Sequence, residues 1–68
     1  MTSVTLQPHQ QRVVEEKRDL DEKTGRLAAF LETKTYDALV PEERGRLRSQ
    51  LFYMRRYADV LGERIAAF

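Results

Sequence analysis

The segment Lys23-Thr24-Gly25-Arg26 combines the kinds of groups that bind a phosphate. A lysine and an arginine lie close to Gly25, whose missing side chain would leave a notch where a phosphate meets a cation and a hydroxyl. Glycine in a helix interior costs about 1 kcal/mol relative to alanine, so some compensating role is expected. That role can also be structural, because a glycine lets a neighbouring helix approach closely. Residue types alone leave both interpretations open.

Composition argues against catalysis and against a metal site. The sequence has no cysteine, and His9 is its single histidine, which excludes ligand sets built from cysteines or from several histidines. It also has no glycine-rich phosphate loop and no carboxylate pair in a recognisable catalytic motif. We therefore expect a protein that is not an enzyme, uses no cofactor and no metal, and binds its ligand without cleaving it.

The charge balance limits the partners of the chain. Twelve basic and eleven acidic residues leave a formal net charge of +1, which is too small to attract duplex DNA or an anionic membrane surface. No apolar stretch is long enough to cross a bilayer, and residues 1–8 lack the features of a signal peptide. The sequence thus predicts a cytoplasmic protein with no membrane and no DNA partner, in which cations must be gathered locally to bind an anion.

Two prolines divide the chain into helical segments that must position these groups. Helices are predicted over residues 8–32 and 41–68, each with a proline in its first turn, and residues 33–40 connect them. Thr5 or Gln7 is the expected cap of the first helix. Glu42 and Glu43 favour the start of the second helix through its dipole. A short connection between long helices predicts an all-α, single-domain antiparallel hairpin.

Apolar residues recur at the heptad spacing of a helix–helix seam. In the second helix they are Leu47, Leu51, Met54, Ala58, Leu61, Ile65 and Phe68. The first helix has a thinner seam, interrupted near Lys17, consisting of Val13, Leu20, Thr24, Leu27 and Leu31. The seam is the strongest signal in the sequence and predicts which face of each helix is buried.

Other large apolar residues lie off this seam. They are Val14, Phe30, Phe52, Tyr53, Tyr57 and Val60, and on the second helix they form a tyrosine-rich stripe. A hairpin covers one face of each helix, and a chain of this size buries only about 60% of the surface that it exposes when unfolded. These residues need another chain or a ligand to cover them, and self-association is the remaining way to stabilise so small a core, so the sequence predicts an oligomer.

The sequence resembles a known family. The segments "PHQQRVVEEK" and "YADVLGERIAAF" are the most specific parts of a similarity that extends from Leu6 to Phe68. They are similar to the hairpin domain of phage anti-CBASS sponges, and a related hairpin occurs in the anti-Thoeris sponges. The resemblance implies a homohexamer in the cytoplasm of the infected bacterium. It also implies sequestration, without cleavage, of cyclic dinucleotides such as 3',3'-cGAMP and, in some members, of cyclic trinucleotides, so that the immune effector is not activated.

The resemblance also implies which residues bind ligand. Lys23 matches the family's lysine late in the first helix, and Gly25 matches a small residue of the pocket wall. His9 stands where the family has an aromatic platform, a departure that offers less stacking area than a tyrosine. Arg12 and Arg26 are further candidates for this dinucleotide site. For the trinucleotide site, the matching residues are Arg64 and Ala67.

Other interpretations of the same residues stay open. Arg12, Lys17 and Arg18 alternate with acids in a pattern typical of a solvated helix face, with a possible i,i+4 pair between Asp19 and Lys23. A nucleic-acid-binding hairpin would use the arginines of the second helix, and a protein inhibitor would lay one helix face on a host enzyme. Salt-dependent oligonucleotide binding would support the first alternative, and capture of a host protein the second.

Overall fold

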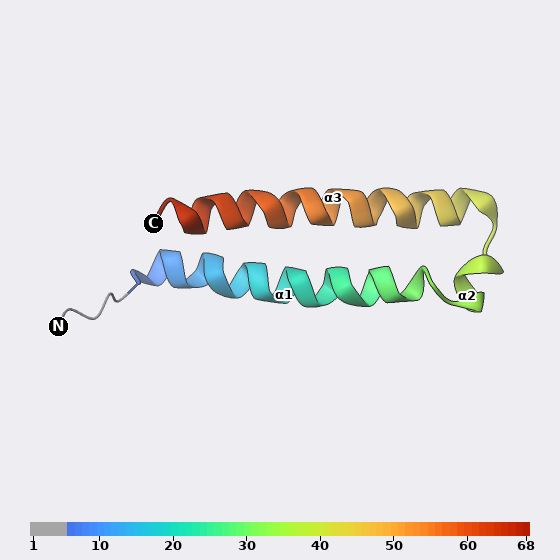
Figure 1. Ribbon diagram of the computed structural model, residues 1–68, viewed down its shortest axis with the longest axis horizontal. Coiled ribbons are helices and arrows are strands. Elements are labelled where there is room, and N and C mark those ends of the chain that lie inside the picture. The colour runs from blue at the N-terminus through green and yellow to red at the C-terminus, as the bar shows by residue number, and fades with distance from the viewer. Residues whose placement is uncertain (1–5) are drawn as a thin grey trace.

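The chain folds as an antiparallel helical hairpin (Figure 1). This computed structural model describes residues 6–68. Its helices are α1 (Pro8–Phe30), α2 (Lys34–Asp37) and α3 (Pro41–Ala66), and the two long helices, α1 and α3, pack against each other. Helix α1 begins and α3 ends at the open end of the hairpin, opposite the turn. The predicted all-α hairpin is confirmed, whereas its assembly into an oligomer stays a prediction.

Local hydrogen bonds and prolines explain where the long helices begin. Pro8 occupies the first turn of α1, and the backbone N–H of Gln7 donates to Oε1 of Gln10 at 2.9 Å. This contact closes one side of a capping box, so Gln7 is the cap of α1, while Thr5 lies outside the described residues. Helix α3 begins at Pro41 with acids in its first turn, as the sequence predicted.

Both long helices end slightly earlier than predicted. Helix α1 ends at Phe30 instead of extending to residue 32, and α3 ends at Ala66 instead of residue 68. The prediction that Phe68 closes the seam is therefore wrong: its side chain is 42% exposed. The reason is that Ala67 already caps α3, so Phe68 no longer follows the helical spacing that would turn it toward α1.

The heptad seam forms the narrow core. Val13 of α1 and Leu51 and Leu61 of α3 are buried, and the other predicted seam residues within the helices are half-buried. Thr24 is accommodated there because its hydroxyl donates to the backbone oxygen of Leu20 at 2.7 Å, which satisfies its polar atom inside the helix. The seam pattern therefore predicted the buried faces correctly.

The connection is more ordered than the sequence indicated. It contains α2, whose cap Thr33 accepts a hydrogen bond from the backbone N–H of Tyr36 at 3.2 Å. Tyr36 is buried, only 7% exposed, and its ring meets Phe30 edge-on at 6.2 Å between centroids. Its hydroxyl accepts a hydrogen bond from Nη1 of Arg48 at 2.8 Å and donates to the backbone oxygen of Arg44 at 3.3 Å. Tyr36 thus connects the turn to the first turns of α3 by two hydrogen bonds.

The hairpin is a rod with much uncovered apolar surface. It measures 56 × 16 × 15 Å, and its radius of gyration is 16.1 Å, against roughly 11 Å for a compact globule of this length. The off-seam residues of α3 remain exposed, namely Phe52, Tyr53, Tyr57 and Val60. We call Tyr53, Tyr57 and Val60 the α3 stripe, since their spacing places them on one side of the helix. Among residues 6–68, no helix has the length and apolar character needed to span a bilayer.

Candidate functional site

An open groove on one flank of the hairpin brings together two of the predicted cations and an aromatic ring. Its volume is about 480 Å³. Helix α1 contributes most of the lining and α3 contributes one tyrosine; the lining residues are Arg12, Glu15, Glu16, Asp19, Leu20, Lys23 and Tyr57. We call this the Lys23 groove. It combines positive charge, carboxylates and an aromatic surface.

Helical spacing explains this arrangement. Arg12, Glu16, Asp19 and Lys23 follow one another at intervals of three or four residues, so they form one row along α1 beside the buried seam. Tyr57 belongs to the α3 stripe and is 44% exposed, with part of its ring available to a ligand. The row and Tyr57 therefore face the same flank of the hairpin.

The cations of the Lys23 groove are available to an anion. The ion pairs of residues 6–68 are Lys17 with Asp21, Glu43 with Arg46 and Arg56 with Asp59, and none involves Arg12 or Lys23. The possible pair between Asp19 and Lys23 is not formed, so the lysine ammonium has no ion-pair partner among the described residues. An incoming phosphate would not have to displace an existing partner.

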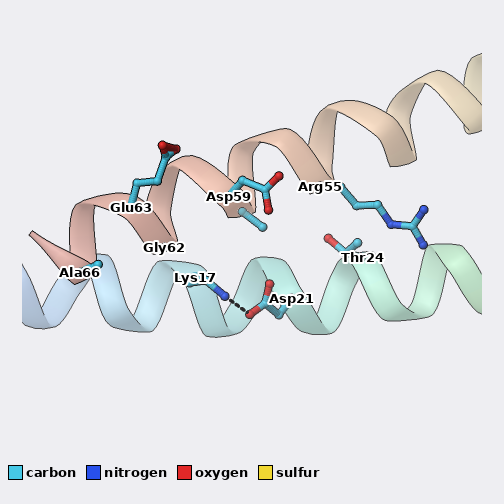
Figure 2. Close-up of a pocket in the computed structure, with 9 residues that line it drawn as sticks. Lys17, Asp21, Thr24, Arg55, Asp59, Gly62, Glu63 and Ala66 are labelled. Carbon is cyan, nitrogen blue, oxygen red and sulfur yellow. Dashed lines mark hydrogen bonds and ion pairs between the residues drawn. The ribbon is translucent and has the colours of Figure 1, made fainter.

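A second groove on another flank is larger but chemically less suited to a nucleotide. Figure 2 shows its lining from α1 and α3, and its volume is about 720 Å³. Its cations are Arg55 and Lys17, and Nζ of Lys17 is already paired with Oδ2 of Asp21 at 2.7 Å. Its lining includes three carboxylates, from Asp21, Asp59 and Glu63, and no aromatic ring. We therefore favour the Lys23 groove as the candidate site.

The remaining residues predicted for the dinucleotide site lie apart from this groove. His9 is exposed in the first turn of α1, about 21 Å along the helix from Lys23 at 1.5 Å per residue. One chain therefore cannot bring both side chains onto one compact ligand. Arg26 lies one turn beyond Lys23 in the same row, outside the residues that line the groove.

Gly25 does not form a notch beside Lys23 within one chain. The two residues are two positions apart, so their Cα–Cβ directions differ by roughly 200° around the helix. A Cβ placed on Gly25 would have no neighbouring atom within 4 Å, apart from its own helix backbone. Close packing against α3 of the same chain is excluded as well, because nothing contacts this position.

The residues predicted for the trinucleotide site lie at the open end of the hairpin. Arg64 is exposed in the last turn of α3, seven residues after Tyr57 and thus on the same side of the helix. Ala67 is the C-cap of α3, three residues further along. The two are close to each other in the chain but lie outside the Lys23 groove.

Four lining residues of the groove were not predicted to bind ligand, namely Tyr57, Asp19, Glu15 and Glu16. Tyr57 was attributed to surplus apolar surface and the acids to a solvated face. Tyr57 lies beside Lys23 because of the register between α1 and α3. Heptad spacing within one helix does not define that register. The position of Tyr57 just off the seam indicates a flank, but not which α1 residues it faces.

The comparisons with known proteins identify the family. The Sequestin family model matches residues 7–67, nearly the whole chain, so the chain belongs to the Sequestin family. This is, by name, the family of phage sponges that the sequence resembles, and the name indicates a sequestering function. The searches of curated proteins and of solved structures returned no match.

Proposed function

We propose that this protein binds cyclic dinucleotides such as 3',3'-cGAMP in the Lys23 groove and withholds them, without cleavage, from the effectors of the CBASS immune system. The observation that carries the proposal is the presence of Lys23 and Tyr57 in one open groove, whose lining also includes Arg12 about 16 Å further along α1. In this function the protein acts in the cytoplasm of a phage-infected bacterium and needs no cofactor.

The groove chemistry suits one half of a cyclic dinucleotide. Each half carries a negative phosphate and a flat base. Lys23 provides an ammonium for the phosphate, and a charge-assisted hydrogen bond of this kind contributes about 1.5–3 kcal/mol. Tyr57 provides a ring for the base, and base–aromatic stacking contributes about 1–3 kcal/mol. Two symmetry-related chains would supply both halves.

Assembly is part of the proposal because one chain leaves the groove open and the α3 stripe uncovered. Tyr53 of the stripe is 68% exposed even though its ring meets that of Phe52 edge-on at 5.3 Å between centroids, so most of its apolar surface is uncovered. In a homohexamer, as the family resemblance implies, a second chain would cover the stripe and close the groove. It could also supply His9 to a ligand bound by the first chain's Lys23, since one chain cannot supply both.

Cyclic trinucleotides are proposed as ligands of a separate site around Arg64 and Ala67. Both residues lie at one end of the rod, where three chains can meet around an axis. Three arginines brought together in this way would balance three phosphates.

The exposed α3 stripe also favours a second candidate function, the binding of a host protein to one helix face. A nucleic-acid-binding hairpin is disfavoured, because Arg46 and Arg56 are paired with acids and the net charge is only +1. A monomeric chain that captures a host protein in the absence of nucleotides would support the second candidate.

The direct test is to incubate the protein with a panel of cyclic di- and trinucleotides, remove free ligand, denature the protein and identify what is released. We expect intact cyclic dinucleotide, bound in proportion to the protein chains. A matched control compares Lys23→Ala with Lys34→Ala, because Lys34 is an exposed lysine of α2 outside the groove. Release of linear products, or equal binding by both variants, would contradict the proposal.

A further inference from the structure

Three carboxylates in the Lys23 groove are not explained by phosphate binding. Glu15, Glu16 and Asp19 line the groove and are exposed, and none of them takes part in the ion pairs of residues 6–68. Negative groups beside a phosphate site weaken anion binding. They are favourable only where the ligand also presents hydrogen-bond donors, because an ionised carboxylate can accept but not donate.

Asp19 is the carboxylate best placed to meet a base that stacks on Tyr57. It lies four residues before Lys23, so the two side chains are neighbours on α1, and Leu20 continues the apolar surface toward α3. Glu16 and Glu15 lie roughly 10 and 12 Å from Lys23 along the helix axis at 1.5 Å per residue. Asp19 is therefore the carboxylate of this groove within reach of a base that lies between Tyr57 and Lys23.

The natural bases differ in what this edge offers. Guanine presents two donors side by side on its Watson–Crick edge, the N1–H and the N2 amino group, which match the two oxygens of one carboxylate. Adenine presents a donor beside the unprotonated N1, whose lone pair faces a carboxylate oxygen unfavourably. A site that hydrogen-bonds the correct group discriminates strongly against an analogue that leaves its polar atoms unpaired.

We propose that Asp19, Lys23 and Tyr57 form a guanine-selective half-site: Tyr57 stacks on the base, Asp19 accepts hydrogen bonds from its N1–H and N2–H, and Lys23 pairs with the phosphate. The inference rests on the proposed function, since it names the base that the same groove selects. The chain accordingly sequesters guanine-containing cyclic dinucleotides in preference to those with adenine alone.

The test uses calorimetric titration of the assembled full-length chain with cyclic di-GMP and with cyclic di-AMP. For the unmodified protein we expect tighter binding of cyclic di-GMP by about tenfold or more, the scale of one hydrogen bond to a charged group. Asp19→Asn should weaken cyclic di-GMP binding by about tenfold and leave cyclic di-AMP binding unchanged or improved. Tyr57→Ala should weaken both ligands, whereas Tyr57→Phe should retain both.

The matched control is Glu22→Gln, which removes an exposed carboxylate of α1 outside the groove and should change neither titration. Circular dichroism and particle mass verify that each variant remains folded and assembled. Equal affinities for the two ligands, or the same fractional loss for both with Asp19→Asn, would overturn the guanine assignment while leaving sequestration intact. Binding of 3',3'-cGAMP but of neither symmetric ligand would overturn the guanine assignment alone. Failure of the unmodified protein to bind any of the three would instead overturn the proposed function, and this inference with it.

Discussion

Lys17 passes over the backbone of Gly62 where the two long helices meet. Its Cε lies 3.4 Å from the position that a Cβ would take on Gly62, and its ammonium continues to Oδ2 of Asp21 at 2.7 Å. The α1 seam has a lysine here where an apolar residue is expected, and Gly62 leaves room for its stem (Figure 2). A polar residue in a seam generally lowers stability but fixes how the helices align.

This contact predicts opposite effects for two substitutions at Gly62. Alanine would touch only the flexible end of Lys17, so Gly62→Ala should raise the free energy of unfolding by up to about 1 kcal/mol through helix propensity. Gly62→Leu should displace Lys17 and lower the free energy of unfolding. Thermal unfolding at a fixed protein concentration measures both, and destabilisation by alanine would show that the Lys17 stem cannot move.

Substitution of Tyr36 should lower the free energy of unfolding more than substitution of any other residue of the turn. Tyr36→Phe removes the hydroxyl that bonds Arg48 and the Arg44 backbone, at an expected cost of about 1 kcal/mol. Tyr36→Ala also removes a buried ring and should cost about 3 kcal/mol or more. Denaturant unfolding measures the series, with Thr35→Val, which removes an exposed hydroxyl of α2, as the control. Equal effects of Tyr36→Phe and Thr35→Val would contradict the role of the Tyr36 hydroxyl.

Lys23 and Arg64 should separate the two proposed sites. Lys23→Ala should weaken cyclic dinucleotide binding by about 1.5–3 kcal/mol, the scale of a charge-assisted hydrogen bond, and leave the oligomer intact. Arg64→Ala should spare that site and weaken cyclic trinucleotide binding. Titration of each variant with both ligand classes measures this, and the same losses from either substitution would indicate one site rather than two.

We expect the exposed α3 stripe to form the contact between chains, so that substitutions in it reduce the particle mass. Light scattering should give a mass near six times the 8.0 kDa of one chain, and the melting temperature should rise with protein concentration. Replacing Tyr53 and Val60 by serine should reduce the mass, whereas Phe52→Ser, which lies off the stripe, should have a smaller effect. A stable monomer at micromolar concentration would refute the assembly.

Gly25→Ala tests the notch that the sequence suggested. Because a Cβ there meets no neighbouring atom, we expect the free energy of unfolding to rise by about 1 kcal/mol. If Gly25 of one chain contacts a ligand bound by another, affinity should fall while particle mass is unchanged. Unchanged affinity would remove Gly25 from the site, and loss of the oligomer would assign it to packing between chains.

The sequence predicted the fold well where one helix carries the information. Heptad spacing gave the buried faces, and Pro8 and Pro41 gave the helix starts. Helix α2 and the burial of Tyr36 were not predicted, because they depend on the Thr33 cap and on a contact with Arg48, twelve residues away. The end of α3 was also missed, since its seam pattern continues in sequence to Phe68 beyond the last helical turn.

The candidate site was predictable in its charges but not in its geometry. Arg12 and Lys23 were recognised, and the structure places both in one groove. Tyr57 joins them only through the register of two helices. Gly25 lies next to Lys23 in sequence but points away from it within one chain, so its role in the site stays a prediction. Their roles toward a ligand stay predictions, as do those of His9 and Arg64.

The thin core has a consequence for the lifetime of the protein in the cell. Among residues 6–68 the buried hydrophobic side chains are Val13, Tyr36, Leu51 and Leu61, so an isolated hairpin has little to resist local opening. Proteases cleave chains in their open states at rates set by how often those states are populated. If the chain assembles as proposed, degradation should remove free chains much faster than assembled ones, and the cell would retain the protein mainly in its assembled form.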